Sequence, residues 1–195
     1  KKETGCADPY YYQKKEGNEI ALSLIPKVRE ILDDDNSLET YVKIAIVGNI
    51  LDFGTYGLGT EFESMISEGL EKELVINKIE EFEEALRKYD KVLYLVDNTG
   101  EIVFDKFLLE KIKEYDVDIT VAVKERPILN DACMEEALEA GLDELATLIT
   151  TGSDSVGVVE SMISDEFKEI LLSSPFVISK GMGNFEGLTE MNFKG

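Results

Sequence analysis

Apolar and polar positions follow two different periods along this chain, and its second half changes regularly from one to the other. Short apolar runs typical of buried strands occupy residues 91–96, 118–123, 145–150 and 175–179. Apolar residues three and four apart fill the intervals. The helices that this spacing predicts cover residues 76–89, 102–115, 131–140 and 165–172. Strands that alternate with helices predict a Rossmann-like α/β fold, with helices on both faces of a mostly parallel sheet.

The N-terminal part has a helical pattern without obvious chemistry. After an irregular lead-in over residues 1–15, apolar spacing predicts a helix over residues 18–32 that kinks at Pro26. Ser37 is a suitable N-cap for a second helix that runs to about residue 47.

The next segment, residues 48–60, holds four glycines and is too glycine-rich for a helix. Taken alone, it is equally well explained as a flexible connection. We therefore expect a small helical part over residues 1–60 and an α/β core over residues 61–195.

Each predicted strand is followed by a polar or glycine-rich turn. These turns are DNTGE (97–101), ND (130–131), TGSD (151–154) and KGMGN (180–184). In an open parallel sheet, ligands bind in the crevice beyond the carboxyl ends of the strands. We therefore expect polar groups that are far apart in sequence to meet at one edge of the sheet.

Oxygen ligands dominate the first two turns. Asp97 and Asn98 place a carboxylate and an amide side by side, and Asp131 could supply a second carboxylate. This set suits Mg²⁺ or Mn²⁺. The chain has no histidine and no cysteine cluster, so a zinc site built from those residues is excluded. The alternative for each acid is that it only caps the helix that follows.

The remaining turn residues are candidates for binding phosphate. Gly100 opens a helix whose backbone N–H groups could hold an anion, and Glu101 follows it as a candidate catalytic group or a residue favoured by the helix dipole. Lys180 follows an apolar strand and could bind phosphate as a point charge, or could be an ordinary surface lysine. Asp154 and Asn184 lie in the last two turns and are expected at the same edge.

Composition narrows the range of partners. A net charge of −21 argues against nucleic acid and against anionic membranes as partners. No stretch approaches the length of a membrane span, and no apolar segment typical of a secretion signal follows Lys1. Cys6 and Cys133 lie far apart, so we expect reduced thiols and a cytoplasmic location. Without an initiating methionine, the chain is expected to be a fragment; its oligomeric state cannot be predicted.

Three motifs resemble those of a known family. DNTGEIVFD (97–105), SKGMGNFEGL (179–188) and GNILDFG (48–54) resemble the damage-control phosphatase family, also called domain of unknown function 89, in its stand-alone archaeal type. The resemblance covers roughly residues 8–190. It implies a metal-dependent phosphatase that acts on small phosphorylated metabolites, such as sugar phosphates or damaged cofactor precursors.

The resemblance also implies roles for individual residues. Asp97, Asn98 and Asp131 would bind a divalent metal, with Mg²⁺ or Mn²⁺ favoured and Co²⁺ or Ni²⁺ acceptable to the same oxygen set. Lys180 would hold the substrate phosphate. Asn49 and Asp52 would line the substrate pocket, which replaces the interpretation of their segment as a connection.

The mechanism stays open between two routes. Asp97 could attack phosphorus directly. Alternatively, a water activated by the metal could attack while Asp97 or Glu101 accepts its proton, and this route is favoured because a carboxylate committed to a metal is a poorer nucleophile.

Two other functions remain possible on the sequence. One is a carboxyl methyltransferase that uses S-adenosylmethionine, and the other is a non-catalytic module that binds phosphate or nucleotides. Methyl transfer has no need of Asp97, Asn98 and Asp131 around a cation, whereas release of inorganic phosphate separates an enzyme from a binding module.

Overall fold

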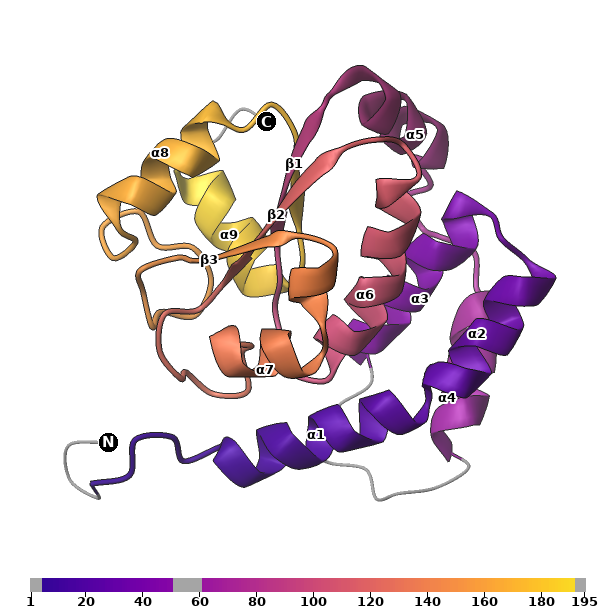
Figure 1. Ribbon diagram of the computed structural model, residues 1–195, viewed down its shortest axis with the longest axis horizontal. Helices are drawn as coiled ribbons and strands as arrows, with labels where there is room; N and C mark the ends of the chain where they lie inside the picture. The colour runs from indigo at the N-terminus through magenta and orange to yellow at the C-terminus, as the bar shows by residue number, and fades with distance from the viewer. Residues whose placement is uncertain (1–4, 51–60, 192–195) are drawn as a thin grey trace.

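The computed structural model describes residues 5–50 and 61–191 and shows a four-stranded parallel sheet with helices on both faces (Figure 1). The strands are β1 (Lys91–Leu95), β2 (Asp118–Val123), β3 (Thr147–Thr150) and β4 (Val177–Ser179), in the spatial order β3-β2-β1-β4. Tyr94 pairs with Val121 on one side and Ile178 on the other. The predicted α/β class is confirmed.

The helices alternate with the strands from β1 onward. Before β1 lie α1 (Tyr11–Ser23), α2 (Ile25–Asp34), α3 (Leu38–Ile50), α4 (Glu61–Glu71) and α5 (Ile79–Lys88). After it come α6 (Glu101–Lys113), α7 (Met134–Glu139), the short 3-10 helix η1 (Leu142–Glu144), α8 (Asp165–Ser173) and α9 (Met182–Glu190). No helix in residues 5–50 and 61–191 is long and apolar enough to cross a membrane.

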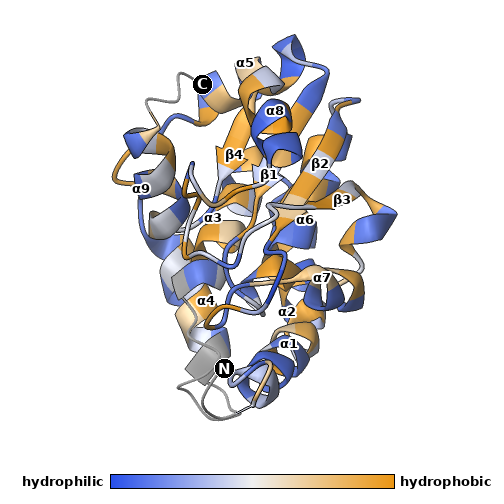
Figure 2. Cartoon of the chain, turned by 90° about the vertical axis from the view of Figure 1, so that its left-hand side faces the viewer, coloured by the Kyte–Doolittle hydropathy of each residue, from blue (hydrophilic) through white to orange (hydrophobic). Residues whose placement is uncertain are grey.

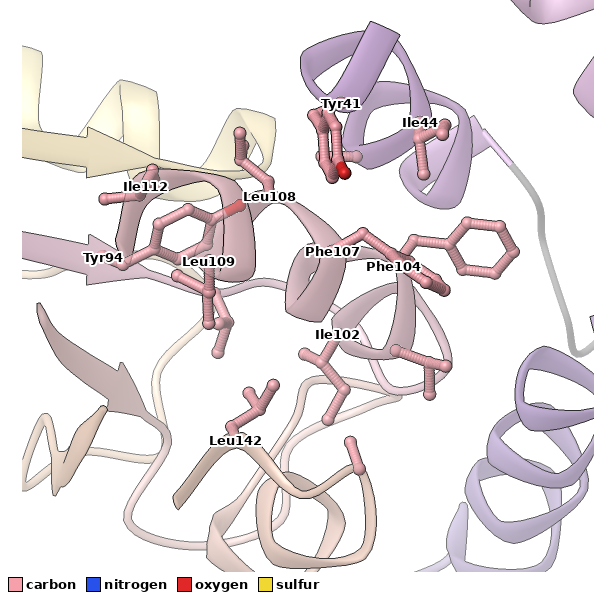
Figure 3. Packing of buried hydrophobic residues seen from close by; sticks show 14 of the residues in the cluster. Tyr41, Ile44, Tyr94, Ile102, Phe104, Phe107, Leu108, Leu109, Ile112 and Leu142 are labelled. Atoms are coloured by element: carbon pink, nitrogen blue, oxygen red, sulfur yellow. The ribbon is translucent and has the colours of Figure 1, made fainter. Parts of the chain in front are cut away.

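Alternate residues of the central strand point into two separate cores. Val92 and Tyr94 face the larger core, which α6 shares with the N-terminal helices. Figure 3 shows Tyr41 and Ile44 of α3 gathered around aromatic and aliphatic side chains of α6. Leu93 and Leu95 face the smaller core, to which α8 contributes Phe167 and Leu171. The strands are accordingly among the most hydrophobic segments in Figure 2.

The N-terminal helices differ in detail from the prediction. Helix α1 begins at Tyr11, inside the segment expected to be irregular, and the chain breaks at Leu24 instead of kinking. Pro26 lies in the first turn of α2, where its missing N–H is not needed. Ser37 does cap α3, since its Oγ accepts the Thr40 N–H at 3.3 Å.

Helix α3 also continues through Gly48 and Asn49, which were expected to lie outside any helix. Gly48 is needed because a Cβ there would come within 2.8 Å of the Phe104 Cβ on α6. Residues 51–60, with Asp52 and the predicted domain boundary, lie outside the described residues. The domain division stays a prediction, although α1–α3 and the sheet share one core.

Helix α9 was not predicted, because its glycines were interpreted as a turn. The same glycines allow close packing against the loop before α8. A Cβ on Gly187 would lie 1.9 Å from the carbonyl oxygen of Val158, and one on Gly157 would lie 2.1 Å from that of Gly183. The low helix propensity of these residues is outweighed by tertiary packing.

The core of α6 offers a direct test of the packing. Leu109 is fully buried, so Leu109→Ala should lower the free energy of unfolding by about 2–5 kcal/mol. Leu172→Ala on α8 is the matched control, since Leu172 is 60% exposed and should change stability by no more than about 0.5 kcal/mol. Urea unfolding measures both, and equal losses would contradict the assigned core.

Candidate functional site

The turns after β1 and β2 are joined by backbone hydrogen bonds. The Thr99 N–H donates to the Asn130 carbonyl at 2.8 Å, and the Ala132 N–H donates to the Asp97 carbonyl at 2.9 Å. Asn98 and Asp131 pair across this junction as an isolated β-bridge. The two segments expected to supply metal ligands are therefore adjacent.

The turn after β4 lies beside the turn after β1. The Lys180 N–H donates to the Leu95 carbonyl at 2.9 Å, which joins the ends of β4 and β1. Gly181 then passes so close to Asp97 that a Cβ on it would lie 2.2 Å from the Asp97 Cγ. Its φ of +81° also favours glycine. Three of the four turns thus meet at one edge of the sheet.

Asp97 lies in a concentration of negative charge. Its Oδ2 accepts hydrogen bonds from Asn49 at 3.1 Å and from the Asn98 side chain at 2.8 Å. Burial, together with the charges of Glu101 and Asp131, raises the pKa of Asp97 to about 6. Burial also raises the pKa of Asp131. A cation would relieve both effects.

The donor set therefore fits a hard cation. In the described part of the chain, the buried Asp131 Oδ2 has no hydrogen-bond partner. The Asn98 NH₂ group is turned toward Asp97 and Glu101, which leaves its oxygen as a possible ligand. In residues 5–50 and 61–191, no site could be built from three or more acidic or cysteine side chains alone. The candidate ligands are therefore two carboxylates, Asp97 and Asp131, and the amide of Asn98.

Glu101 is fully buried, and both of its oxygens are engaged. Oε1 accepts from Lys180 at 2.5 Å, while Oε2 accepts from Asn49 at 2.7 Å and from the Asn98 N–H at 3.2 Å. A carboxylate with these bonds positions its neighbours better than it accepts a proton from water. The geometry therefore favours a positioning role over the catalytic role expected for Glu101.

Lys180 is partly buried and belongs to an ion cluster. Its Nζ donates to the Ala45 carbonyl at 2.9 Å, to Glu101 at 2.5 Å and to Asp105 at 2.7 Å. Burial lowers its pKa, but the charges of Asp105 and Glu101 outweigh burial and leave that pKa raised. An ammonium group has three N–H donors, and here all three are used. Phosphate binding by Lys180, as expected from the sequence, would require one of these bonds to break.

The Gly100 N–H is also occupied. It donates to the Asn18 Oδ1 on α1 at 2.9 Å, and Asn18 is only 1% exposed. Binding of a phosphate oxygen by this N–H, as expected from the sequence, would require the bond to Asn18 to break. Asn18 lies 82 residues before Gly100, and nothing in the local sequence pattern indicates their contact. Figure 1 shows α1 lying beneath α7 and the start of α6.

Asn184 and Asp154 have separate roles. The Asn184 side-chain NH₂ is buried and donates to the Val96 carbonyl at 3.0 Å and to the Lys180 carbonyl at 2.9 Å. It therefore fastens two strand ends instead of presenting its NH₂ to a ligand. Asp154 is partly exposed and pairs with Arg126 at 3.5 Å, and no hydrogen bond within the described residues joins it to Asp97.

Lys124 was missed by the sequence analysis. It follows β2 directly, is 3% exposed, and donates to the Gly157 carbonyl at 2.9 Å. The Asp131 carboxylate lies 3.6 Å from its Nζ. Burial lowers the pKa of Lys124, against the opposing charges of Asp131 and Asp97. Like Lys180, Lys124 directly follows an apolar strand, and this position is visible in the sequence.

This fold and site place the chain in a defined family. The profile of the damage-control phosphatase ARMT1-like domain matches residues 1–194, and the chain belongs to that family. The resemblance inferred from the three motifs is confirmed.

Individual relatives agree with this assignment. The chain is 44% identical to an uncharacterized protein of Methanocaldococcus jannaschii, over 100% of the chain and 66% of the relative. It is 36% identical to a damage-control phosphatase of Pyrococcus horikoshii (96% of the chain, 65% of the relative) and 35% identical to one of Archaeoglobus fulgidus (97% and 67%).

A solved structure confirms the fold. The crystal structure of a DUF89 family protein from Pyrococcus horikoshii matches with a TM-score of 0.85 at 36% identity, over 95% of this chain and 65% of that one. The chain thus spans about two-thirds of the length of the relatives it matches.

The close approach of Gly181 to Asp97 can be tested. Gly181→Ala should weaken Mn²⁺ binding by at least about 10-fold, because the new methyl group would displace the Asp97 carboxylate. Gly141→Ala is the matched control. Gly141 has a similar φ of +72°, but its Cβ would meet the movable ends of the Lys106 and Glu144 side chains. Calorimetric titration with Mn²⁺ measures both, and equal affinities would contradict the assigned contact.

Proposed function

We propose that this chain is part of a metal-dependent phosphatase that hydrolyses phosphomonoesters of small metabolites. The observation that carries the proposal is the meeting of Asp97, Asn98 and Asp131 at the carboxyl edge of the sheet, beside the buried Lys124 and the partly buried Lys180. The names of the Pyrococcus horikoshii and Archaeoglobus fulgidus relatives support it.

Asp97, Asn98 and Asp131 would hold the metal. A divalent ion held there would supply Lewis-acid stabilisation of the phosphoryl oxygens. Oxygen ligands favour Mg²⁺ or Mn²⁺, and the same set accepts Co²⁺ or Ni²⁺. Damage-control phosphatases are metal-dependent in general, whereas the particular ion is part of this proposal.

The surrounding residues would keep these ligands in place. Glu101 fixes the Asn98 backbone and the Asn49 side chain through its Oε2, and Asn49 in turn donates to Asp97. We assign the attack on phosphorus to water, with Asp97 as the proton acceptor, because the oxygens of Glu101 are already bonded. Asn49 would also contact the substrate, as would Asp52, which lies outside the described residues.

The substrate class follows from charge and from the site. A chain with a net charge of −21 repels nucleic acid and anionic membranes, so a small phosphorylated metabolite in the cytoplasm is the partner we propose. The methyltransferase alternative is not favoured, since methyl transfer gives no reason to gather Asp97, Asp131 and Glu101 at one edge of the sheet.

Phosphate release tests the proposal. Protein stripped with a chelator should be inactive on a panel of sugar phosphates and p-nitrophenyl phosphate, and Mg²⁺ or Mn²⁺ should restore turnover. Asp97→Asn should lower kcat/KM by at least about 100-fold, because Asp97 would both bind the metal and accept the proton. Loss of a residue that only supports a metal ligand already costs about 10- to 100-fold.

The control for that variant is Asp143→Asn, which removes one exposed negative charge from η1 and should leave turnover unchanged. Wild-type protein that releases no phosphate with any of the metals would contradict the proposal and favour a binding module.

A further inference from the structure

We propose that Lys124 is the lysine that binds the substrate phosphate, and that Lys180 is a positioning residue for the metal ligands. This inference rests on the proposed phosphatase function. It reverses the assignment that the position of Lys180 after an apolar strand suggests.

The contacts of Lys180 leave it no donor for a substrate. Its three N–H groups are directed to the Ala45 carbonyl, Glu101 and Asp105. The partner carboxylates are themselves almost completely buried. Turning Lys180 toward a phosphate would leave a buried negative charge without its counter-ion, which is strongly unfavourable.

Lys124 has donors to spare. Of its three N–H groups, one donates to the Gly157 carbonyl at 2.9 Å. The Asp131 oxygen, at 3.6 Å, is beyond normal hydrogen-bond range. The side chain is 4% exposed, so its charge is poorly hydrated and an incoming phosphate oxygen would be attracted strongly.

Lys124 also lies beside the candidate metal ligands. Its backbone N–H donates to the Ala132 carbonyl at 3.0 Å, one residue beyond Asp131, and Lys124 forms an isolated bridge with Cys133. Its Nζ contacts Gly157, which packs against the start of α9. The ammonium group is therefore at the junction of the turns after β2, β3 and β4, where a phosphate bound to the metal would be within reach.

Lys180 would act on the metal ligands indirectly, through Glu101. It holds Oε1 of Glu101, whose other oxygen binds the Asn98 N–H and the Asn49 side chain. Loss of Lys180 would free Glu101 to move and would loosen the ligands that depend on it. The effect should appear in metal affinity, whereas loss of Lys124 should appear in phosphate affinity.

Two titrations of the full chain separate the roles: Mn²⁺ alone, and inorganic phosphate at saturating Mn²⁺. Lys124→Met should raise the Kd for phosphate by at least about 10-fold, as expected for a lost charge-assisted contact, and leave the Kd for Mn²⁺ within about threefold. Lys124→Arg should restore part of the phosphate affinity, because it keeps the charge. Lys180→Met should raise the Kd for Mn²⁺ by about 10- to 100-fold and change phosphate affinity little.

Lys168→Met is the control, since Lys168 pairs with Glu160 on the surface. Thermal unfolding verifies each variant, and Lys124→Gln replaces Lys124→Met if the latter does not fold. Unchanged phosphate affinity in the Lys124 variants, lost phosphate affinity in Lys180→Met at saturating Mn²⁺, or no phosphate binding by wild type would each overturn the inference. Wild-type protein that binds phosphate through Lys124 but hydrolyses no ester would refute only the proposed function.

Discussion

The buried ion cluster of Lys180, Glu101 and Asp105 is the interaction on which both the fold and the site depend. It joins the end of β4 to the first turns of α6, and the Ala45 carbonyl adds α3 to the same point. Tyr94 of β1 completes it by donating to Asp105 at 2.8 Å. Charges this deeply buried persist only when each has its partner, so the cluster holds four elements in one arrangement.

The candidate site lies next to this cluster. Glu101 belongs to both, because one oxygen faces Lys180 and the other faces the residues around Asp97. Burial raises the pKa of both Asp97 and Asp131, and the charges of Glu101 and Asp131 add to the effect at Asp97, while Lys124 opposes it at both acids. On the proposed function, a cation would bind there, and through the cation an anion that the acidic surface would otherwise repel.

The rule that ligands bind beyond the carboxyl ends of parallel strands predicted which residues gather at the candidate site. It identified Asp97, Asn98, Asp131 and Lys180 from their positions after apolar runs, and the structure brings them to one edge. It could not predict which donors are already used. Whether Lys180 or Gly100 has a free N–H depends on Asp105, Ala45 and Asn18, which the strand-end rule does not connect to them. Helix α9 was missed for a related reason, because its glycines serve packing against a distant loop.

The central claim is that one edge of the sheet binds a metal and a phosphate together. Its most direct test is the Kd for Mn²⁺ measured with and without inorganic phosphate, and the Kd for phosphate measured with and without Mn²⁺. Binding at a shared site requires each ligand to tighten the other by the same factor, and a coupling of about 10-fold or more is expected. Mn²⁺ and phosphate that bind independently, or Mn²⁺ that does not bind at all, would contradict the account.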